Sequence, residues 1–324
     1  MFRKELALMA MVCALCACNL DAQEVYGDLY NAPGRKIEVH GGGMDVYGSV
    51  FNRGTVFIVP FGTFWAERRL ENYGLIEMYN GECASNEVFK NFDTGEIRGY
   101  GVVDSVEDIH NRGLLRSLGG PLLVCSGAGF SNTGILANGP GTSLTIVVEK
   151  LVAADVAGVP LVDNYGTIEV ASDGAVVFDC NLVNEPNGVL KLLGGTLAAK
   201  TVTQEAGATL EGFGAITGDL VIEPNAAIKL TGPTNIVGDV KITEGGTLEI
   251  KDGTTLVTGK VVCNGTIHLK GGYVIPQGGL SGSCNIIWEP GIYTNVADFN
   301  LDGKVNLKDF ALFADTWLWQ SGWH

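Results

Sequence analysis

The chain repeats one short pattern of residues at a nearly constant interval, and this repeat constrains the fold more than any other feature. Gly218-Asp219-Leu220-Val221-Ile222 returns as Gly238-Asp239-Val240-Lys241-Ile242 and as Gly259-Lys260-Val261-Val262-Cys263, at intervals of 20 and 21 residues. Each copy is followed by a second apolar alternation, such as Leu248-Glu249-Ile250. Alternation with a period of two is typical of β-strands, and a fixed period near 20 residues indicates a stacked array of coils.

A second marker, Asn followed closely by Gly, extends this period over most of the chain. From Asn31 onward the markers follow one another at 18 to 21 residues, apart from a single interval of 32. We interpret the long interval as one coil with an insertion of about a dozen residues within 147–160. The count predicts about twelve coils of about 20 residues each. The markers are Asn31, Asn52, Asn72, Asn91, Asn111, Asn132, Asn164, Asn184, Glu205, Glu223, Glu244 and Asn264.

Asn and Gly have different roles at the marker. Asn tolerates a left-handed backbone, and stacked amides can each donate to one neighbouring coil and accept from the other. Gly lets the chain turn without a Cβ clash. Past the Gly, one set of side chains should point inward and the charged residues between them outward, with Glu169 beside Lys191 and Lys229 beside Glu249. The predicted core includes Val56, Ile58, Ile76, Met78, Ile168, Val170, Leu190, Leu192, Leu248, Ile250, Ile267 and Leu269.

Composition and charge support an all-β fold and narrow the classes of partner. Glycine accounts for 46 of the 324 residues, roughly twice its average use, and the hydrophobic fraction of 46% argues against disorder. The net charge of -15 argues against nucleic acid as a partner, because phosphate binding requires a basic surface. No apolar run long enough to span a membrane follows the N-terminal segment, so no transmembrane span is expected.

The first 22 residues are typical of a secretory signal peptide. The basic pair Arg3-Lys4 precedes an apolar run from Leu6 to Ala17. Two cleavage sites are open. Leu15-Cys16-Ala17-Cys18 resembles the lipobox of bacterial lipoproteins, with Cys18 as a lipid anchor, whereas Leu20-Asp21-Ala22 would end an ordinary signal. Both interpretations predict an exported protein, either secreted or held at the cell surface.

Five cysteines follow the signal, an odd and scattered set that does not indicate a disulfide framework. Cys263 and Cys284 are 21 residues apart, about one coil. Stacked strands would place their Cα atoms about 4.8 Å apart, which is within reach of a disulfide. We predict two buried thiols that fill core positions, with the disulfide as the alternative.

The periodicity stops after Tyr293, and a calcium-loop pattern begins at Asp298. Oxygen ligands fall at loop positions 1, 3, 5, 9 and 12, with Gly303 at position 6, where the chain must turn around the ion. Such a site suits Ca²⁺, a hard ion that prefers oxygen, whereas zinc would require His or Cys. Apolar residues from Phe310 to Leu318 recur at helical spacing, which predicts a short helix. The predicted ligands are Asp298, Asn300 and Asp302 through side chains, Lys304 through its carbonyl, Asn306 through water, and Asp309.

The C-terminal loop, with Val305 at position 8 and Asp309 at position 12, resembles a type I dockerin repeat more than an intracellular calcium sensor. Dockerins are calcium-folded modules that attach secreted enzymes to cohesin domains. The resemblance implies Ca²⁺ as a cofactor and a cohesin-like or cell-surface partner. A dockerin has two such repeats and this chain has one, so a calcium-stabilised cap or sorting tag is the alternative.

The coils resemble right-handed parallel β-helices, and the segment from Gly212 to Leu220 is similar to glycine-rich repeats of autotransporter passenger domains. Parallel β-helices include polysaccharide lyases and hydrolases, so two acidic groups are candidate acids and bases. No nucleophile motif, phosphate loop or zinc spacing accompanies them. These groups are Glu71, Glu77, Glu82 and Glu96, and Asp104, Glu107, Asp108 and His110.

Together the patterns predict an all-β, right-handed parallel β-helix, or β-solenoid, over 23–292. A signal peptide over 1–22 precedes it, and a small α-helical, EF-hand or dockerin-like calcium segment over 293–324 follows. The predicted function is an exported structural, surface or glycan-binding protein that is tethered through the calcium segment, with polysaccharide along the solenoid. Catalysis is not assigned. The alternative is a secreted carbohydrate-active enzyme, either a polysaccharide lyase or a glycoside hydrolase, with a dockerin-type module.

Overall fold

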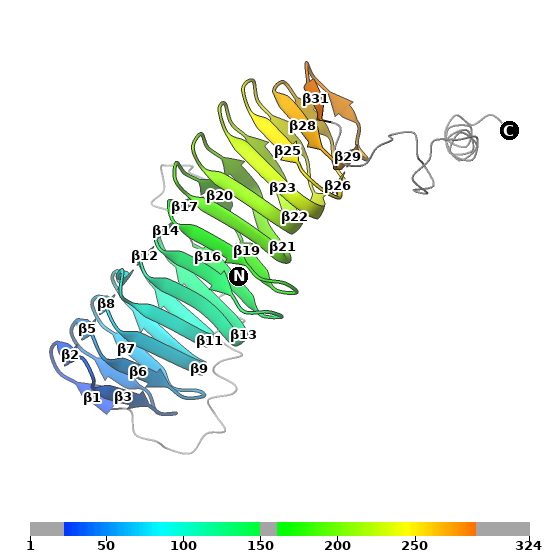
Figure 1. Cartoon of the computed structure of the whole chain (residues 1–324). Helices are drawn as coiled ribbons and strands as arrows, with labels where there is room; N and C mark the ends of the chain where they lie inside the picture. The colour runs from blue at the N-terminus through cyan, green and yellow to red at the C-terminus, as the bar shows by residue number, and fades with distance from the viewer. Residues whose placement is uncertain (1–22, 150–160, 290–324) are drawn as a thin grey trace, which may run out of the picture.

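The chain winds around one axis as an all-β parallel solenoid. The computed structural model describes residues 23–149 and 161–289. They form about thirteen turns of right-handed type. Figure 1 shows the turns stacked from β1 (Gln23–Val25) at one end to β31 (Asn285–Glu289) at the other. Each strand pairs in parallel with the strand one turn away, as the sequence period predicts.

Each turn crosses three faces in the same order, which we call face 1, face 2 and face 3. Strands that lie on face 1 alone are β1, β4 (Met44–Val46), β7 (Thr63–Ala66), β16 (Ser143–Val148), β19 (Ala175–Phe178), β26 (Thr254–Val257) and β29 (Tyr273–Pro276). Face 2 contains β2 (Leu29–Asn31), β5 (Val50–Asn52), β8 (Leu70–Asn72), β10 (Phe89–Asn91), β12 (Asp108–Asn111), β14 (Gly129–Asn132), β17 (Leu161–Asn164), β20 (Asn181–Asn184), β24 (Val240–Ile242), β27 (Val261–Cys263) and β30 (Leu280–Ser281). Face 3 contains β3 (Lys36–Val39), β6 (Thr55–Ile58), β15 (Ile135–Asn138), β18 (Thr167–Val170), β25 (Thr247–Ile250), β28 (Thr266–Lys270) and β31.

Longer strands bend around a corner and join two or three faces. Their bends carry glycines at positive φ, such as Gly99 and Gly212, where the backbone adopts a conformation that disfavours a Cβ. The strands that pass from face 3 to face 1 are β9 (Leu75–Ser85), β11 (Glu96–Ser105), β13 (Leu114–Ser126) and β23 (Ala227–Val237), and those that cross all three faces are β21 (Val189–Gln204) and β22 (Thr209–Ile222).

The core is a set of apolar stacks inside the solenoid, as predicted. All twelve residues predicted to point inward are buried, and most are fully inaccessible to solvent. The outward register is also confirmed, because Glu169 pairs with Lys191 and Lys229 with Glu249. Asn132 pairs with Asn164, so the interval of 32 residues is a single turn. Part of the predicted insertion, residues 150–160, lies outside the described residues.

The Asn markers form a continuous hydrogen-bonded ladder at the end of face 2. Asn31 Nδ2 donates to Asn52 Oδ1 at 2.7 Å, and the same amide-to-amide bond continues turn by turn to Asn184. The stacked amides are buried, so each bond satisfies polar groups that would otherwise lie unpaired in the interior. These Asn residues lie at strand ends and not at positive φ, so hydrogen bonding explains their presence and left-handed geometry does not.

The predicted register was wrong beyond Asn184. Asn184 Nδ2 donates to Gln204 Oε1 at 2.9 Å, so Gln204 and not Glu205 continues the ladder. The next positions in register are Ile222, Ile242 and Cys263, where apolar side chains replace the amide. The prediction placed the marker at Glu205, Glu223, Glu244 and Asn264, whereas the buried position lies one residue earlier, or two in the case of Glu244.

The Gly of each marker is needed because successive turns approach closely. A Cβ on Gly74 would lie 2.1 Å from the carbonyl oxygen of Gly54, and one on Gly134 would lie 2.2 Å from that of Gly113. Only a residue without a side chain fits beneath the preceding turn.

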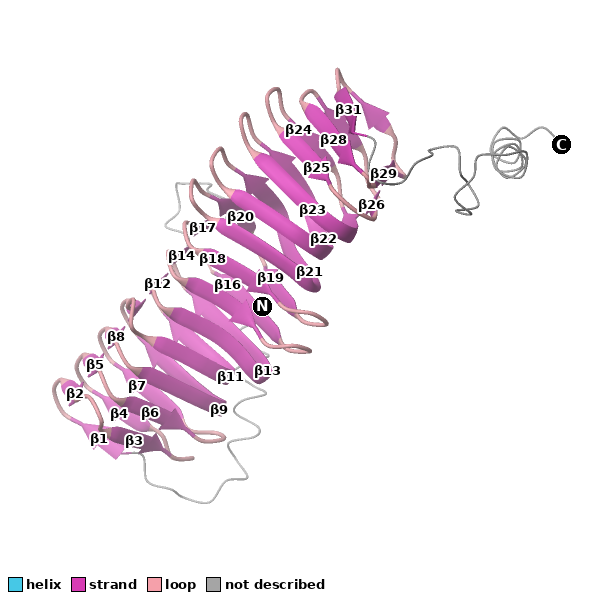
Figure 2. Ribbon diagram, viewed as in Figure 1, coloured by secondary structure: helices cyan, strands magenta, loops and turns pink. Residues whose placement is uncertain are grey.

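The predicted fold class was wrong in two respects. The described residues contain about thirteen turns and not twelve, because Tyr273–Glu289 adds a turn whose corner has no Asn marker. They also contain no helix, as Figure 2 shows, so the α-helical component of the predicted fold class is not found in them. The helix predicted over 310–318 lies outside the described residues. No described element is a helix capable of spanning a membrane.

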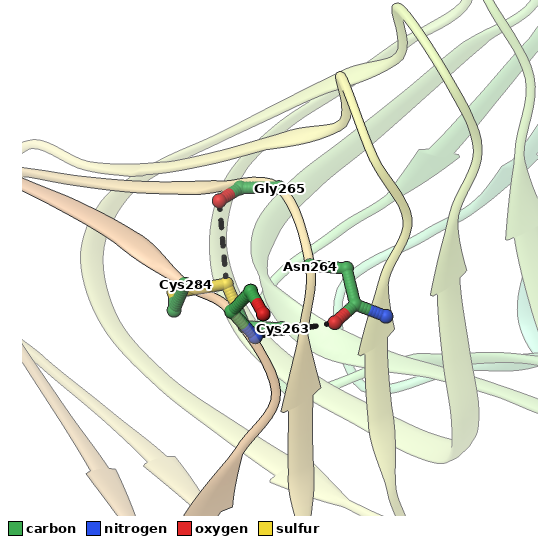
Figure 3. Close-up of a disulfide and its surroundings, with 5 residues drawn as sticks. Cys263, Asn264, Gly265 and Cys284 are labelled. Atoms are coloured by element: carbon green, nitrogen blue, oxygen red, sulfur yellow. Dashed lines mark hydrogen bonds between the residues drawn. A yellow bond between two sulfur atoms is a disulfide. The ribbon is translucent and has the colours of Figure 1, made fainter.

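The prediction of two free thiols at Cys263 and Cys284 was also wrong. The two residues form a disulfide with a Cα–Cα distance of 4.9 Å, close to the separation expected between adjacent turns (Figure 3). Beside it, Asn264 Oδ1 accepts a hydrogen bond from the Ser283 backbone N–H at 3.2 Å. The bond therefore links the last two described turns.

Candidate functional site

Outward-facing aromatic side chains cluster on the first five turns of the solenoid. Every ring pair and every ring with an adjacent cation that the structure records in the described residues lies between Tyr26 and Arg112. Stacked turns place equivalent outward residues one above another, so a repeated aromatic position becomes a row of rings. This end of the solenoid therefore differs chemically from the rest of its surface.

A shallow recess of about 250 Å³ opens at the corner between faces 1 and 2. Its walls are the side chains of Tyr47 and Trp65, with Asp45 and Glu67 beside them. Asp45 on β4 pairs in register with Trp65 on β7, so its carboxylate lies one turn from the indole. Glu67 follows Trp65 by two residues and also faces outward. A carboxylate therefore flanks the indole on each of two sides.

The Tyr47 side of the recess is held in place by its neighbours in the first turn. The rings of Tyr26 and Tyr47 stack with centroids 5.0 Å apart. Both hydroxyls donate to the Glu24 carboxylate, at 2.6 Å from Tyr26 and 3.4 Å from Tyr47. The hydrogen bond to Glu24 raises the pKa of Tyr26, and the negative charge of Glu24 raises the pKa of Tyr47. Both phenols therefore stay neutral donors at neutral pH.

A second group of rings runs along the corner between faces 2 and 3, and it is closed by the protein's own cations. Tyr73 and Phe92 stack with centroids 4.2 Å apart. Arg53 covers the Tyr73 ring at 5.3 Å and Arg112 covers Phe92 at 5.8 Å, while Arg112 also pairs with Asp93 at 2.9 Å. Because both outer ring faces are occupied, this row is best explained as surface packing.

The candidate acids and bases of the sequence do not converge on one site. Glu71 and His110 lie on face 2, where Glu71 accepts from Tyr73 and His110 bonds Ser131. Glu77 and Glu96 lie on face 3, and both pair with Arg98. Glu82 and Asp104 lie on face 1, Asp108 begins β12 on face 2, and Glu107 lies at the corner between them. The structure thus divides the two predicted groups among three faces.

Glu82 and Asp104 are the exception, because they are neighbours on face 1. Val102 pairs with Glu82, and Asp104 follows two residues later on the same face. Burial raises the pKa of Glu82, and the charge of Asp104 raises it further. Glu82 also pairs with Thr63, two residues before Trp65, so the two carboxylates lie near the aromatic recess. A partly buried carboxyl with a raised pKa is better suited to donate a proton than one with its usual pKa.

Cysteine chemistry does not contribute a nucleophile at Cys83 or Cys180. Both thiols are buried. Burial raises the pKa of Cys83 and raises that of Cys180 to about 12. Neither is a thiolate at neutral pH, the form that attacks an electrophile.

A larger trough of about 500 Å³ lies at the corner between faces 3 and 1. It runs across four turns, from Gly120 through Thr142 and Asp173 to Gly195. Its walls are mostly backbone and small side chains, and Asp173 is its only charged residue. Nothing in this trough provides the aromatic faces of the first recess.

Face 3 of the later turns carries an alternating row of charges. Glu and Lys alternate from turn to turn in register, and the row ends at His268, which pairs with Glu249; opposite charges on adjacent strands stabilise their register. At the end of the row, His268 also contacts Glu289 at 2.9 Å, and Lys270 contacts Glu249 at 3.2 Å. The row consists of Glu169, Lys191, Glu211, Lys229, Glu249 and His268.

All the predicted calcium ligands lie outside the described residues. They are Asp298, Asn300, Asp302, Lys304, Asn306 and Asp309. Within 23–149 and 161–289, no group of His, Cys, Asp and Glu side chains is arranged to hold a metal ion.

The aromatic recess was not predicted from the sequence, although two signals pointed to it. Tyr26 and Tyr47 are equivalent positions in the segments that match at a shift of 21 residues. Trp65 lies between buried Phe64 and Ala66, so alternation directs its large side chain outward. A Trp whose side chain points outward from a strand is a stronger indication of a binding surface than carboxylates dispersed over several faces.

Comparison with known proteins gives little information on this chain. No family model matches it, and no curated protein matches it. One similar solved structure is the crystal structure of a TibC-catalysed hyper-glycosylated fragment of TibA. It has 14% sequence identity and a TM-score of 0.45, and the match covers 83% of this chain and 98% of that chain. The fold assigned above rests on strand register and does not depend on this likeness.

Proposed function

We propose that the chain is an exported β-solenoid that binds polysaccharide on its first turns. The observation that carries the proposal is the recess between Tyr47 and Trp65, with carboxylates beside the indole. Aromatic faces provide apolar area for the C–H face of a sugar ring, and carboxylates accept hydrogen bonds from sugar hydroxyls. The parallel rows on a rigid solenoid would present these groups at the spacing of successive turns.

We further propose that the protein is secreted or held at the cell surface. The signal-like segment over 1–22 supports export, and Cys18 would serve as a lipid anchor if the lipobox is used. The dockerin-like loop, with Asp298, Asn300, Asp302, Lys304, Asn306 and Asp309 as ligands, would bind Ca²⁺ and attach the solenoid to a cohesin-like or cell-surface partner. Its donor set suits the ion, because every ligand is an oxygen.

The binding function is tested by retention of the purified full-length protein on a panel of insoluble polysaccharides. Retention on at least one polymer should fall strongly for Trp65→Ala and Tyr47→Ala. Tyr165→Ala is the matched control, because Tyr165 and Tyr47 are both 47% exposed but Tyr165 lies outside the recess. Retention that is lost equally in all three variants, or absent for the wild type on every polymer, would contradict the proposal.

A glycoside hydrolase is the second candidate, and the raised pKa of Glu82 beside Asp104 favours it over a lyase. Face 1 of the first five turns has no Lys or Arg to neutralise the acid group of an anionic polymer, as a lyase requires. Analysis of soluble products after incubation with each retained polymer distinguishes binding from cleavage. Products released by the wild type but not by Glu82→Gln would support hydrolysis, and retention without products would support binding alone.

A further inference from the structure

The recess between Tyr47 and Trp65 has no recorded cation over either of its rings, in contrast to four other outward rings of the first five turns. Four outward rings have a Lys or Arg above them. At the recess, the described residues place no Lys or Arg over either ring and no ion pair on Asp45 or Glu67. The covered rings are Phe57 with Lys36 at 4.6 Å, Tyr73 with Arg53 at 5.3 Å, Phe51 with Arg69 at 5.3 Å, and Phe92 with Arg112 at 5.8 Å.

On face 1 beside the recess every charged side chain is acidic, and the adjacent basic residues in the sequence, Arg68 and Arg69, follow Glu67 at the corner. The five segments of face 1 nearest the N-terminus contain Glu24, Asp45, Glu82 and Asp104 and no Lys or Arg. Glu67 adds a further carboxylate at the rim. Like charges on adjacent strands disfavour the free protein, and a positively charged ligand would relieve that repulsion.

An aromatic ring beside carboxylates is an arrangement that attracts an ammonium group. The ring face attracts a cation through its quadrupole, and the carboxylate adds a direct Coulomb attraction. An anionic polymer such as a polyuronate meets the opposite field and should be repelled.

We propose that the recess binds a glycan with free amino groups, in which a protonated amine lies against Trp65 between Asp45 and Glu67. This inference rests on the proposed glycan-binding function and names the class of sugar. A sugar is favoured over a Lys-rich polypeptide because the recess is shallow and flanked by two ring side chains, which suit a flat pyranose ring better than a flexible alkyl chain.

The test uses two soluble oligosaccharides of equal length, one of glucosamine and one of N-acetylglucosamine. They share the sugar ring and differ in the charge at the amine. Isothermal titration calorimetry of the full-length protein should show about tenfold tighter binding of the glucosamine oligomer, the sum of one cation–π contact and one exposed ion pair. Higher salt should reduce this preference, because exposed charges are screened.

Variants separate the ring from the charges. Trp65→Ala should weaken binding of both oligomers, whereas Asp45→Asn with Glu67→Gln should remove the preference for glucosamine and leave binding of N-acetylglucosamine unchanged. Glu244→Gln, at an exposed corner distant in the stack from the recess, is the matched control for loss of one carboxylate. The preference should survive in this control.

The outcomes distinguish this inference from the function on which it rests. Equal affinity for the two oligomers, or a preference that survives the Asp45→Asn and Glu67→Gln pair, would overturn the inference and leave glycan binding intact. Binding of neither oligomer nor any polymer of the panel would overturn the proposed function itself. Polylysine that binds as tightly as the glucosamine oligomer and competes with it would show recognition of charge alone, which also overturns the inference.

Discussion

Removal of one amide from the middle of the Asn ladder should destabilise the solenoid far more than removal of the amide at its end. Asn111 is 1% exposed and donates to Asn132 Oδ1 at 2.8 Å and to the carbonyls of Gly113 and Ile135 at 3.2 Å. It also accepts from Asn91 Nδ2 at 2.8 Å. Asn111→Ala therefore breaks the ladder on both sides and leaves a buried acceptor on Asn132.

The expected loss follows from counting these groups. Two ladder bonds contribute about 1 kcal/mol each, and a buried acceptor left unpaired costs about 1–2 kcal/mol more, so Asn111→Ala should lower the free energy of unfolding by about 3–4 kcal/mol. Asn31 is the matched control, because it donates to Asn52 and to the Thr55 carbonyl but accepts from no described amide. Asn31→Ala should cost about 1–2 kcal/mol, since water can reach the open end of the ladder.

Urea unfolding followed by circular dichroism measures both variants, and hydrogen exchange locates the loss. A solenoid can open turn by turn, so amide protection should fall first in the turns on either side of Asn111. The double variant Asn91→Ala with Asn111→Ala should cost about 1 kcal/mol less than the sum of the single losses, because the bond between the two amides is counted twice. A loss at Asn111 no greater than that at Asn31, or strict additivity of the double variant, would refute the ladder as the source of stability.

Three further perturbations have expected outcomes. Cys284→Ser should lower the free energy of unfolding of the last turns by about 3 kcal/mol, because the disulfide closes a loop with a sequence separation of 21. Reduction of the wild type should have the same effect, and reduction of the variant should have none. Burial and the charge of Asp104 raise the pKa of Glu82 in the folded state above its value in the unfolded state. The protonated form therefore adds stability that is present below the unfolded-state pKa of about 4.3 and is lost as the pH rises through the folded-state pKa. Glu82→Gln should therefore require more urea to unfold than the wild type at neutral pH and the same amount in acid, and equal midpoints at neutral pH would contradict this. Calorimetric titration of the full-length protein should detect one Ca²⁺ site that is lost in both Asp298→Ala and Asp302→Ala, and unchanged calcium binding in these variants would exclude the predicted loop.

The fold was predictable from the sequence where stacked positions repeat one residue type. The ladder positions Asn52, Asn72 and Asn111 can be recognised in the sequence, because each buried amide needs an amide partner one turn away. The same reasoning failed at Gln204 and Ile222, since an amide on a longer side chain, or an apolar side chain, also fits the stack. The residue types that follow the corner were then mistaken for the corner itself.

The disulfide was not predictable from spacing alone. Val262 pairs in register with Ser281, so the same register places Cys263 opposite Gly282. The residue that forms the disulfide with Cys263 is Cys284, two residues after Gly282. The bond therefore depends on how the short segment between β30 and β31 folds back toward the core, and the repeat period carries no information on that segment.

The candidate site was less predictable than the core for a physical reason. An inward position is constrained on every side by the turns above and below, so its residue type repeats. An outward position contacts only its neighbours in the same row, and almost any polar or aromatic residue is compatible with the fold. Sequence periodicity thus identified buried residues such as Ile58 but could not rank Trp65 above the carboxylates at Glu71 or Glu96.

This separation between core and surface has a consequence for how the solenoid carries function. Because each turn contacts only the adjacent turns, the first five can carry aromatic rows while the later turns carry the alternating charges from Glu169 to His268, with the same core beneath both. The acidic and basic side chains of this row pair with one another within face 3, so they produce little net electrostatic field for a ligand. The recess at Trp65 is instead lined by Asp45 and Glu67, and the described residues record no ion pair on either carboxylate. Local imbalance of charge beside an exposed ring, and not the number of charged residues, is therefore the property that distinguishes a binding surface on this solenoid from its supporting surface.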